Sequence, residues 1–298
     1  MSFKSGFITL IGAPNVGKST LLNALLGQKI SIVSPRPQTT RNRILGVKHV
    51  DGGQFIFLDT PGILEPKGLL NKSLIQIALK SLEGVQVILL LVDPFSAQPS
   101  IPENLRFRLA KISTPIFLAI NKIDLIDKKT LLPLMDQASK LHSFVKIIPL
   151  SARTGEGLED LEKALLEFLP EGPPYFPEDM ITDLPERFLV GELIREKVFR
   201  LTSQEVPYGV AVTVESFKTR EDKPIIHIQA TIHVERDSQK GILIGKQGRM
   251  LKTIGQQARQ DMEALLGTKV FLELWVRVEK DWSKEAKFLK QFGYEEGL

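Results

Sequence analysis

A short stretch near the N-terminus restricts the possible folds more than any other part of the chain. It runs from Gly12 to Ser19, reads GAPNVGKS, and fits the pattern G-x-x-x-x-G-K-[ST]. The apolar run FITLI precedes it directly and the helix-like run TLLNALLG follows it. A glycine loop between a buried strand and a helix can turn its backbone N–H groups toward an anion at the helix N-terminus. The stretch therefore predicts a phosphate-binding loop in an α/β domain.

The rest of the first 170 residues supports that fold class. Apolar runs without polar alternation are typical of strands buried on both faces, and helical patterns separate them. We expect an α/β domain with a mostly parallel sheet over residues 1–170. The predicted strands are FITLIG, FIFLD, VILLLVD, PIFLAIN and KIIPLSA.

A proline-rich stretch separates this region from a second one. Residues 171–185 are interrupted by prolines that remove backbone donors and disfavour helix, which predicts a linker or a docked extended segment. Residues 186–298 then show an amphipathic helical pattern, two runs of period-two alternation, a helix over 249–266 and a strand over 270–279. This order predicts a separate α+β domain with a C-terminal helix.

Composition excludes several classes of protein. The sequence has no cysteine, so disulfides and thiolate metal sites are ruled out and a reducing compartment is expected. The longest apolar run, residues 85–92, is too short to cross a bilayer. We expect a soluble cytoplasmic protein, with peripheral contact at the cytoplasmic face of the membrane left open.

The phosphate loop supplies the first set of predicted ligand contacts. Lys18 would neutralise the β- and γ-phosphates, and the Ser19 hydroxyl would bind Mg²⁺. The helix N-terminus adds partial positive charge at the same place. The predicted nucleotide-binding residues of this loop are Gly12, Asn15, Val16, Gly17, Lys18, Ser19 and Thr20.

Two further stretches predict the metal site. Asp59 ends the strand FIFLD and begins D-T-P-G, which closes at Gly62. A carboxylate there lies at the ligand-binding edge of an α/β sheet and can hold Mg²⁺ through water. In the loop PRPQTTR we expect Thr40, with Thr39 as the alternative, to bind Mg²⁺ when GTP is present. The predicted catalytic set is Lys18, Ser19, Thr40, Asp59 and Gly62, with Ser19, Thr40 and Asp59 on the metal.

The base is predicted from two stretches at later strand ends. The run NKID gives Asn121, Lys122 and Asp124, and the pair Ser151-Ala152 follows the strand KIIPL. Guanine presents two adjacent donors that the Asp124 carboxylate can accept, whereas adenine presents no such pair. Because an unpaired buried carboxylate is costly, this predicts strong selectivity for guanine. The Ala152 N–H is expected to donate to the guanine O6.

Taken in this order, the stretches over residues 6–170 resemble a translation-factor-related GTPase, which implies a six-stranded sheet with helices on both faces. Many signalling GTPases carry a water-orienting glutamine directly after the D-x-x-G glycine. Here that residue is Ile63, so the resemblance implies slow intrinsic turnover aided by a partner or a cation. Asn15 offers a carbonyl oxygen to K⁺ beside the phosphates; the alternative is that it only shapes the loop.

The second region contains another glycine motif, Gly245-Lys246-Gln247-Gly248. The segment 236–259 around it holds six basic residues and one acidic residue, which suits phosphate contacts or, alternatively, a solvated helix face. The order of its elements resembles a type II KH domain, in which a G-x-x-G loop clamps about four nucleotides of single-stranded RNA. We therefore expect RNA contacts from Gly245, Lys246, Gln247, Gly248, Arg249 and Lys252.

A GTPase domain followed by a KH domain resembles the Era family of bacterial GTPases over essentially the whole chain. The stretches that carry this resemblance include PQTTR, DTPGI, the FPEDMITDLPERF seam, IGKQG and LELWVRV. It implies GTP hydrolysis with Mg²⁺, binding of the 3′ end of 16S rRNA, and a role in 16S rRNA processing and assembly of the 30S ribosomal subunit. We expect the protein to act as a monomer. The alternative is a nucleotide-sensing assembly factor that acts on another RNA and uses hydrolysis as a timer.

The C-terminal region contains aromatic residues, and the sequence leaves open whether they bind RNA or pack inside the domain. Trp275, Trp282, Phe288 and Tyr294 are available to stack on RNA bases. The helical spacing of Trp282, Ala286 and Leu289 favours packing against the domain instead.

Overall fold

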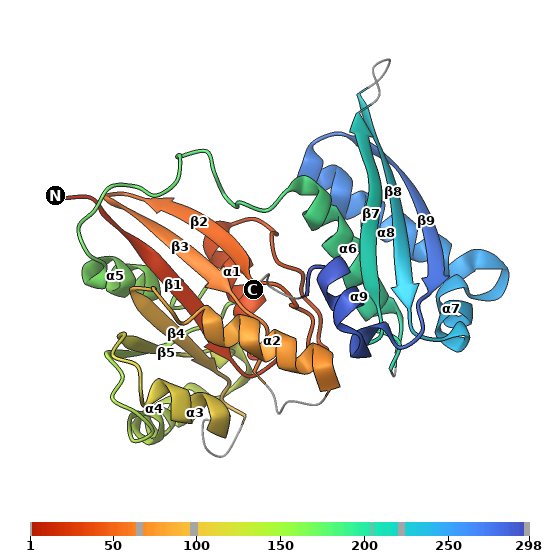
Figure 1. Cartoon of the computed structure of the whole chain (residues 1–298). Coiled ribbons are helices and arrows are strands. Elements are labelled where there is room, and N and C mark those ends of the chain that lie inside the picture. The colour runs from red at the N-terminus through yellow and green to blue at the C-terminus, as the bar shows by residue number, and fades with distance from the viewer. Residues whose placement is uncertain (1, 64–67, 96–100, 204, 220–223, 295–298) are drawn as a thin grey trace. The chain divides into compact units, whose positions relative to one another are not determined.

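The computed structural model describes residues 2–63, 68–95, 101–203, 205–219 and 224–294 (Figure 1). The chain groups into two compact units. One comprises residues 1–31, 40–66 and 74–183, and the other comprises residues 32–39, 67–73 and 184–298. No helix within the described residues is long and apolar enough to cross a membrane.

The first unit is built on a six-stranded sheet in the order β2-β3-β1-β4-β5-β6. Only β2 runs antiparallel to its neighbour; the other pairs are parallel. The mostly parallel α/β fold predicted from the alternation of strands and helices is thus confirmed. The strands are β1 (Lys4–Gly12), β2 (Ile44–Val50), β3 (Gly53–Asp59), β4 (Val87–Val92), β5 (Ile116–Ile120) and β6 (Lys146–Pro149).

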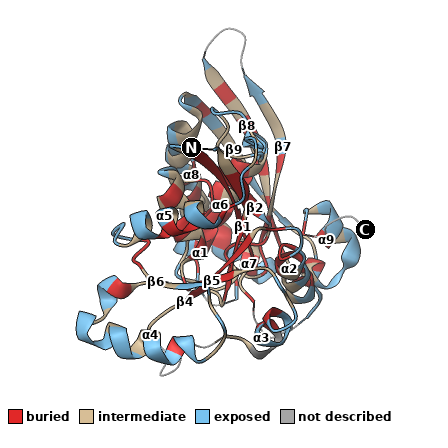
Figure 2. Cartoon of the chain, turned by 90° about the vertical axis from the view of Figure 1, so that its left-hand side faces the viewer, coloured by how far each residue is buried: buried red, intermediate tan, exposed pale blue. Residues whose placement is uncertain are grey.

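Helices cover both faces of this sheet. One face packs against α2, α3 and α4, and Phe117 of β5 meets Phe168 of α5 on the other face at a ring-centroid distance of 5.4 Å. Figure 2 shows buried residues along the central strands, whereas α4 is mostly exposed. The helices are α1 (Lys18–Leu26), α2 (Gly68–Lys80), α3 (Glu103–Leu109), α4 (Leu131–Ser139) and α5 (Leu158–Phe168).

The proline-rich stretch after α5 is extended and docked, the second of the two alternatives. The buried Gln54 side chain accepts from Tyr175 N at 2.7 Å and donates to the Phe176 carbonyl at 2.7 Å. Farther along, Val47 N donates to the Ile181 carbonyl at 2.7 Å. These contacts satisfy backbone groups of a segment that cannot form regular structure because of its prolines.

The second unit is built on a three-stranded sheet in the order β7-β8-β9, with β7 antiparallel and β9 parallel to β8. The apolar positions of α6, α7 and α8 and of the strands share one core. This is the α+β domain that the second region predicts. Its elements are α6 (Glu186–Leu201), β7 (Ala211–Thr219), β8 (Ile225–Val234), α7 (Asp237–Ile244), α8 (Arg249–Leu266), β9 (Lys269–Val278) and α9 (Ala286–Gln291).

Candidate functional site

The phosphate loop joins β1 to α1 and requires glycine at two positions. Gly17, the residue before α1, has φ of 100°, and a Cβ on it would lie 2.2 Å from Asn121 Nδ2. At Gly12 a Cβ would lie 2.4 Å from the Leu91 carbonyl oxygen. Asn15 also adopts positive φ, at 62°, and is exposed. No side chain caps α1, so its first N–H groups remain directed at the loop.

Lys18 is buried inside this loop. Its ammonium donates to the carbonyls of Gly12 at 3.2 Å and Ala13 at 2.9 Å. Burial lowers the pKa of Lys18 from 10.5 to about 8, and the Asp59 carboxylate opposes that shift. Two carbonyls and the Asp59 carboxylate compensate the charge of Lys18 only in part, so this cation is suited to receive the negative charge of a phosphate.

The predicted metal ligands lie together, although they come from three separate parts of the chain. Ser19 Oγ donates to Asp59 Oδ2 at 2.7 Å and lies 2.8 Å from Thr40 Oγ1. Ser31 Oγ donates to the same Asp59 oxygen at 2.9 Å. Asp59 is completely buried, and that burial raises the pKa of its carboxyl, while the charge of Lys18 and the two serine hydroxyls oppose the rise.

This donor set fits Mg²⁺. Hydroxyl and carboxylate oxygens are hard ligands, and the buried Asp59 Oδ1 has no hydrogen-bond partner among the described residues. In that same part of the chain no cluster of three or more His, Cys, Asp or Glu side chains could hold a metal by itself. Phosphate oxygens would have to complete the coordination shell, as Mg²⁺ sites for nucleotides generally require.

Gly62 and Ile63 continue from Asp59 past the phosphate loop. A Cβ on Gly62 would lie 2.7 Å from Pro14, and Ile63 N donates to the Gly12 carbonyl at 3.1 Å. The Ile63 side chain is fully buried in the sheet core. It therefore points away from solvent, so it can neither orient a water nor reach one. Thr20, in the first turn of α1, is partly buried beside the loop.

Asn121 ties the predicted base-binding stretches to the phosphate loop. Its Nδ2 donates to the Val16 carbonyl at 2.7 Å, and its Oδ1 accepts from Lys122 N at 2.8 Å and from Ala152 N at 2.9 Å. Lys122 takes positive φ, at 67°. The N–H of Ala152 thus donates within the protein here, and its donation to guanine O6 stays a prediction.

Asp124 is the exposed member of this group. Ser151 Oγ donates to its Oδ1 at 2.7 Å, and Thr154 N donates to Ser151 Oγ at 3.2 Å. This chain of hydrogen bonds fixes the orientation of the carboxylate and leaves it accessible from solvent. The geometry suits a carboxylate that accepts two parallel donors from a planar base.

Within the second unit, α6 holds the segment that precedes Thr40. Three successive charged residues of this helix, Arg195, Glu196 and Lys197, are buried. Arg195 donates to the Thr39 carbonyl at 2.5 Å and is paired with Glu192, while Glu196 accepts from Val33 N at 2.9 Å. Buried charges are costly unless they are paired or hydrogen-bonded. The backbone of residues 32–39 therefore helps to stabilise the buried charges of α6.

The second glycine loop lies between α7 and α8. Gly245, Gln247 and Gly248 have φ of 69°, 53° and 75°. A Cβ on Gly245 would lie 2.8 Å from Met250 Cβ, whereas nothing lies within 4 Å of one on Gly248. The side chains of Lys246, Gln247, Arg249 and Lys252 are exposed around this open turn.

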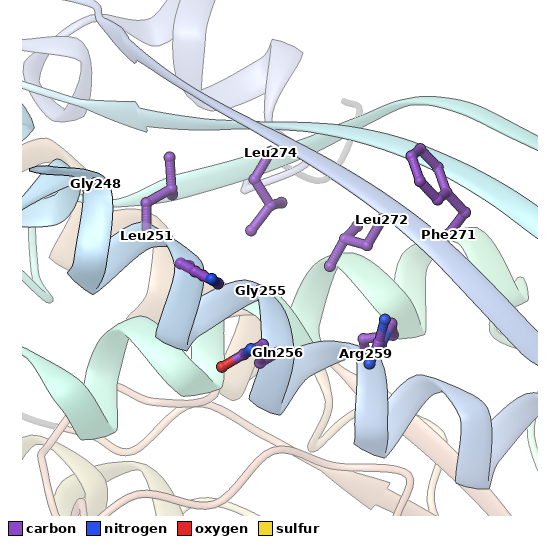
Figure 3. A pocket seen from close by; sticks show the side chains of 9 residues that line it. Gly248, Leu251, Gly255, Gln256, Arg259, Phe271, Leu272 and Leu274 are labelled. Carbon is purple, nitrogen blue, oxygen red and sulfur yellow. The ribbon is translucent and has the colours of Figure 1, made fainter.

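A groove of about 400 Å³ leads from this loop between α8 and β9 (Figure 3). Leucines form its apolar floor, and the polar groups of Lys252, Gln256 and Arg259 come from α8. Its lining residues are Gly248, Leu251, Lys252, Gly255, Gln256, Arg259, Phe271, Leu272 and Leu274.

Comparison with known proteins identifies the family. The chain is 55% identical to GTPase Era of Geotalea uraniireducens over 98% of both chains, and 54% identical to that of Geotalea daltonii over 98% of both. It belongs to the GTPase Era family. Models for a 50S ribosome-binding GTPase and for a KH domain match residues 7–122 and 205–283.

Solved structures of the Era family agree. A crystal structure of Era in complex with MgGDPNP and nucleotides 1506–1542 of 16S ribosomal RNA is 46% identical, with a TM-score of 0.95 over 99% of this chain and 100% of that one. Aquifex aeolicus Era, solved as a variant bound to GDP.AlF4⁻, gives the same identity, coverage and TM-score. The chain is therefore a GTPase with a P-loop domain and a KH domain.

Several residues of these sites carry no motif, and their importance appears only in three dimensions. Ser31 lies in a loop without periodicity, 28 residues before the carboxylate that it contacts. The groove residues Leu272 and Leu274 belong to an ordinary strand pattern, and the sequence identifies Arg259 only as one of several basic residues. The buried charges of α6 contradict the simple amphipathic pattern. The segment 32–39 contacts Arg195 and Glu196, and Asp261 of α8 pairs with Lys197.

Proposed function

We propose that this Era-family GTPase binds the 3′ end of 16S rRNA through its KH domain and acts in 16S rRNA processing and assembly of the 30S subunit. The observation that carries the proposal is the complex of a 46% identical Era with MgGDPNP and nucleotides 1506–1542 of 16S rRNA. The exposed cations around Gly245–Gly248 and the adjoining groove support it, since a KH loop needs room for a sugar-phosphate backbone.

The proposed nucleotide site assigns one role to each group of residues. Gly12, Asn15, Val16, Gly17, Lys18, Ser19 and Thr20 would surround the phosphates. Mg²⁺, when bound by Ser19, Thr40 and Asp59, would neutralise charge on the β- and γ-phosphates. Lys18 would neutralise charge on the same oxygens. Asn121, Lys122, Asp124, Ser151 and Ala152 would select the guanine base.

Asn15 carries a separate proposal, a K⁺ site beside the phosphates. The exposed side chain and positive φ of Asn15 place it at the mouth of the loop, and the buried Ile63 supplies no group that could orient a water. A cation would then provide the missing transition-state charge. Turnover should be faster in K⁺ than in Na⁺ at equal ionic strength, and Asn15→Ala should remove the difference. Equal rates for the unsubstituted protein in the two salts would exclude the K⁺ site.

The setting of this activity is also proposed. We infer a cytoplasmic monomer, with the membrane surface as a further contact. We retain residues 1–170 and 186–298 as the functional domains, with 171–185 as the linker. The second candidate, an assembly factor on another RNA, is favoured only by the broad 50S ribosome-binding GTPase model, which covers the first domain alone.

The deciding experiment measures the affinity of a labelled single-stranded oligonucleotide from the 16S rRNA 3′ end at fixed salt. The protein is loaded with a non-hydrolysable GTP analogue or with GDP, and an unrelated RNA of equal length is the control. Tighter and selective binding with the analogue is the expected result, and thermodynamic linkage requires the RNA to raise the preference for the analogue over GDP by the same factor. Equal affinity for both RNAs would overturn the assignment to 16S rRNA.

A further inference from the structure

We propose that the KH domain has a second RNA-contact surface, on the face of its sheet that is turned away from α8. Its centre is the pair Phe271 and Trp275 on β9, and its occupant is single-stranded RNA that continues beyond the nucleotides held in the groove. The inference rests on the proposed function, because it requires RNA in that groove.

Strand alternation divides the side chains of β9 between two faces. Leu272 and Leu274 are directed at α8 and form the floor of the groove (Figure 3). Phe271 and Trp275 lie on the opposite face and are 55% and 47% exposed. Two large aromatic side chains on one strand, four residues apart, are thus left without a covering layer, at a spacing of about 13 Å.

The other tryptophan of the chain shows how this domain treats an aromatic residue that serves packing. Trp282 is fully buried, its Nε1 donates to the Gly209 carbonyl at 2.9 Å, and its ring meets Phe292 and Tyr294. The packing expected for Trp282 and Leu289 is confirmed. The same expectation is wrong for Ala286, which is exposed, and Trp275 is also open to solvent.

The C-terminal segment covers only one end of this sheet face. Phe292, which follows α9, packs against His233 at a ring-centroid distance of 4.7 Å. His233 pairs in register with Arg277, at the far end of β9 from Phe271. The part of the face around Phe271 and Trp275 is therefore beyond the cover that α9 gives.

The new surface is continuous with the groove. Phe271 lines the groove and also contacts the ring of His227, on the outer face of β8, at 4.8 Å. Since β9 is the edge strand of the sheet, no further strand separates the groove from this face. A nucleic-acid chain that leaves the groove at Phe271 can pass the edge of β9 and reach Trp275 without crossing another element.

The charges on this face are compatible with phosphate. The one carboxylate between the two aromatic residues, Glu273, is engaged by His227 at 3.1 Å and by Gln229 at 2.9 Å. Lys218 is exposed on β7, and Arg277 is exposed on β9, where its Nε lies 2.8 Å from a carboxylate oxygen of Glu279. Aromatic rings that offer stacking beside basic side chains are what sequence-tolerant binding of single-stranded RNA uses, and sheet-borne aromatic residues do the same in other RNA-binding domains.

The test compares a short RNA with a longer one. An oligonucleotide of about four nucleotides from the 16S rRNA 3′ end fills the groove alone. One of about ten nucleotides, extended on both sides, can also reach the sheet face. Trp275→Ala should weaken binding of the longer RNA by about five-fold or more and leave the short RNA unaffected. Trp275→Phe, which keeps a stacking ring, should restore most of the affinity.

Tryptophan fluorescence gives a second readout that a loss of folding would not imitate. Trp275 is the one solvent-accessible tryptophan and Trp282 is the buried reference, and the chain has two in all. Stacking of a base on Trp275 should quench emission with the longer RNA only. In Trp275→Phe the quench should vanish while binding persists.

The outcomes separate the two proposals. Gly248→Asp should weaken both RNAs, and if it weakens neither, the groove assignment itself fails. If Gly248→Asp weakens both RNAs but Trp275→Ala binds the longer one as tightly as the unsubstituted protein, the second surface is refuted and the groove stands. Binding of the longer RNA without any quench would likewise refute the second surface.

Discussion

The phosphate loop and the RNA loop are both glycine turns that lead into a helix, and they differ in how closely the protein surrounds them. Gly17 sits against Asn121, and the neighbouring cation, Lys18, is buried. Gly248 has open space around it, and the neighbouring cations are exposed. An enclosed loop fixes one compact ligand with a few strong contacts, whereas an open loop leaves room for a polymer that must enter and leave sideways.

One added methyl group in each loop should have very different effects. In Gly17→Ala, the Cβ would meet Asn121 Nδ2 at 2.2 Å in a backbone conformation with φ of 100°. Strain of about 1–2 kcal/mol and overpacking of about 1–3 kcal/mol together predict a loss of GTP affinity of about 30- to 5,000-fold. Titration with a fluorescent GTP analogue measures it.

The matched variant is Gly248→Ala, which meets no atom within 4 Å and carries only the strain of its φ of 75°. Its RNA affinity should fall by about five- to 30-fold. Similar losses in the two variants would show that the loops do not differ in enclosure.

The RNA groove can be filled without touching the loop. Gly255 of α8 faces Leu274, and a Cβ there would lie 3.4 Å from Leu274 Cδ1, an ordinary contact. Gly255→Trp should occupy the groove and lower RNA affinity by about 100-fold, since stacking contributes about 1–3 kcal/mol per base. GTP affinity should not change.

Gly255→Ala is the control for that variant, because it alters helix propensity and leaves the groove open. Filter binding of labelled RNA by both variants decides the matter. Undiminished binding by Gly255→Trp would place the RNA elsewhere on the domain.

The phosphate site and the RNA groove also differ in how much of each the sequence predicts. The phosphate site depends on residues in short motifs at strand ends, so the sequence predicts a common site for Lys18, Ser19 and Asp59, and the structure places Ser19 within hydrogen-bond distance of Asp59. In the second domain the sequence also predicts the two ends of α8. The groove depends on which leucines of β9 point toward α8 and on the distance between the two elements. No sequence motif indicates either of these. Ile63 illustrates the limit: its chemistry was evident, but its burial in the core was not.

The enclosed lysine makes nucleotide binding sensitive to pH in a way that exposed cations cannot. Because the pKa of Lys18 is lowered to about 8 in the free protein, Lys18 is charged below that pH and loses its proton above it. The phosphates require the charged form, so GTP affinity should fall by about ten-fold per pH unit above pH 8.

The same shift acts on stability with a defined sign. Between pH 8 and 10.5 the unfolded chain holds more protons on this lysine than the folded chain, so its contribution to the free energy of unfolding rises with pH over that range.

Isothermal titration calorimetry with GTP across this pH range tests the predicted fall in GTP affinity. Lys18→Arg, whose guanidinium stays charged, should lose the dependence, and a flat profile for the unsubstituted protein would contradict the argument.

The smallest expected effect concerns Ser31, which reaches Asp59 from outside the motifs. Its hydroxyl donates to the same carboxylate oxygen as Ser19 does, at 2.9 Å, and is itself buried. Ser31→Ala would remove one hydrogen bond that holds the Asp59 carboxylate in place. One hydrogen bond contributes a net free energy of about 0.5–1.5 kcal/mol, so the Mg²⁺ concentration needed for half-maximal GTP binding should rise by about two- to ten-fold. Ser19→Ala, which removes a proposed ligand, should cost clearly more. If the two variants are equally impaired, Ser31 binds the metal directly and is itself a member of the metal site.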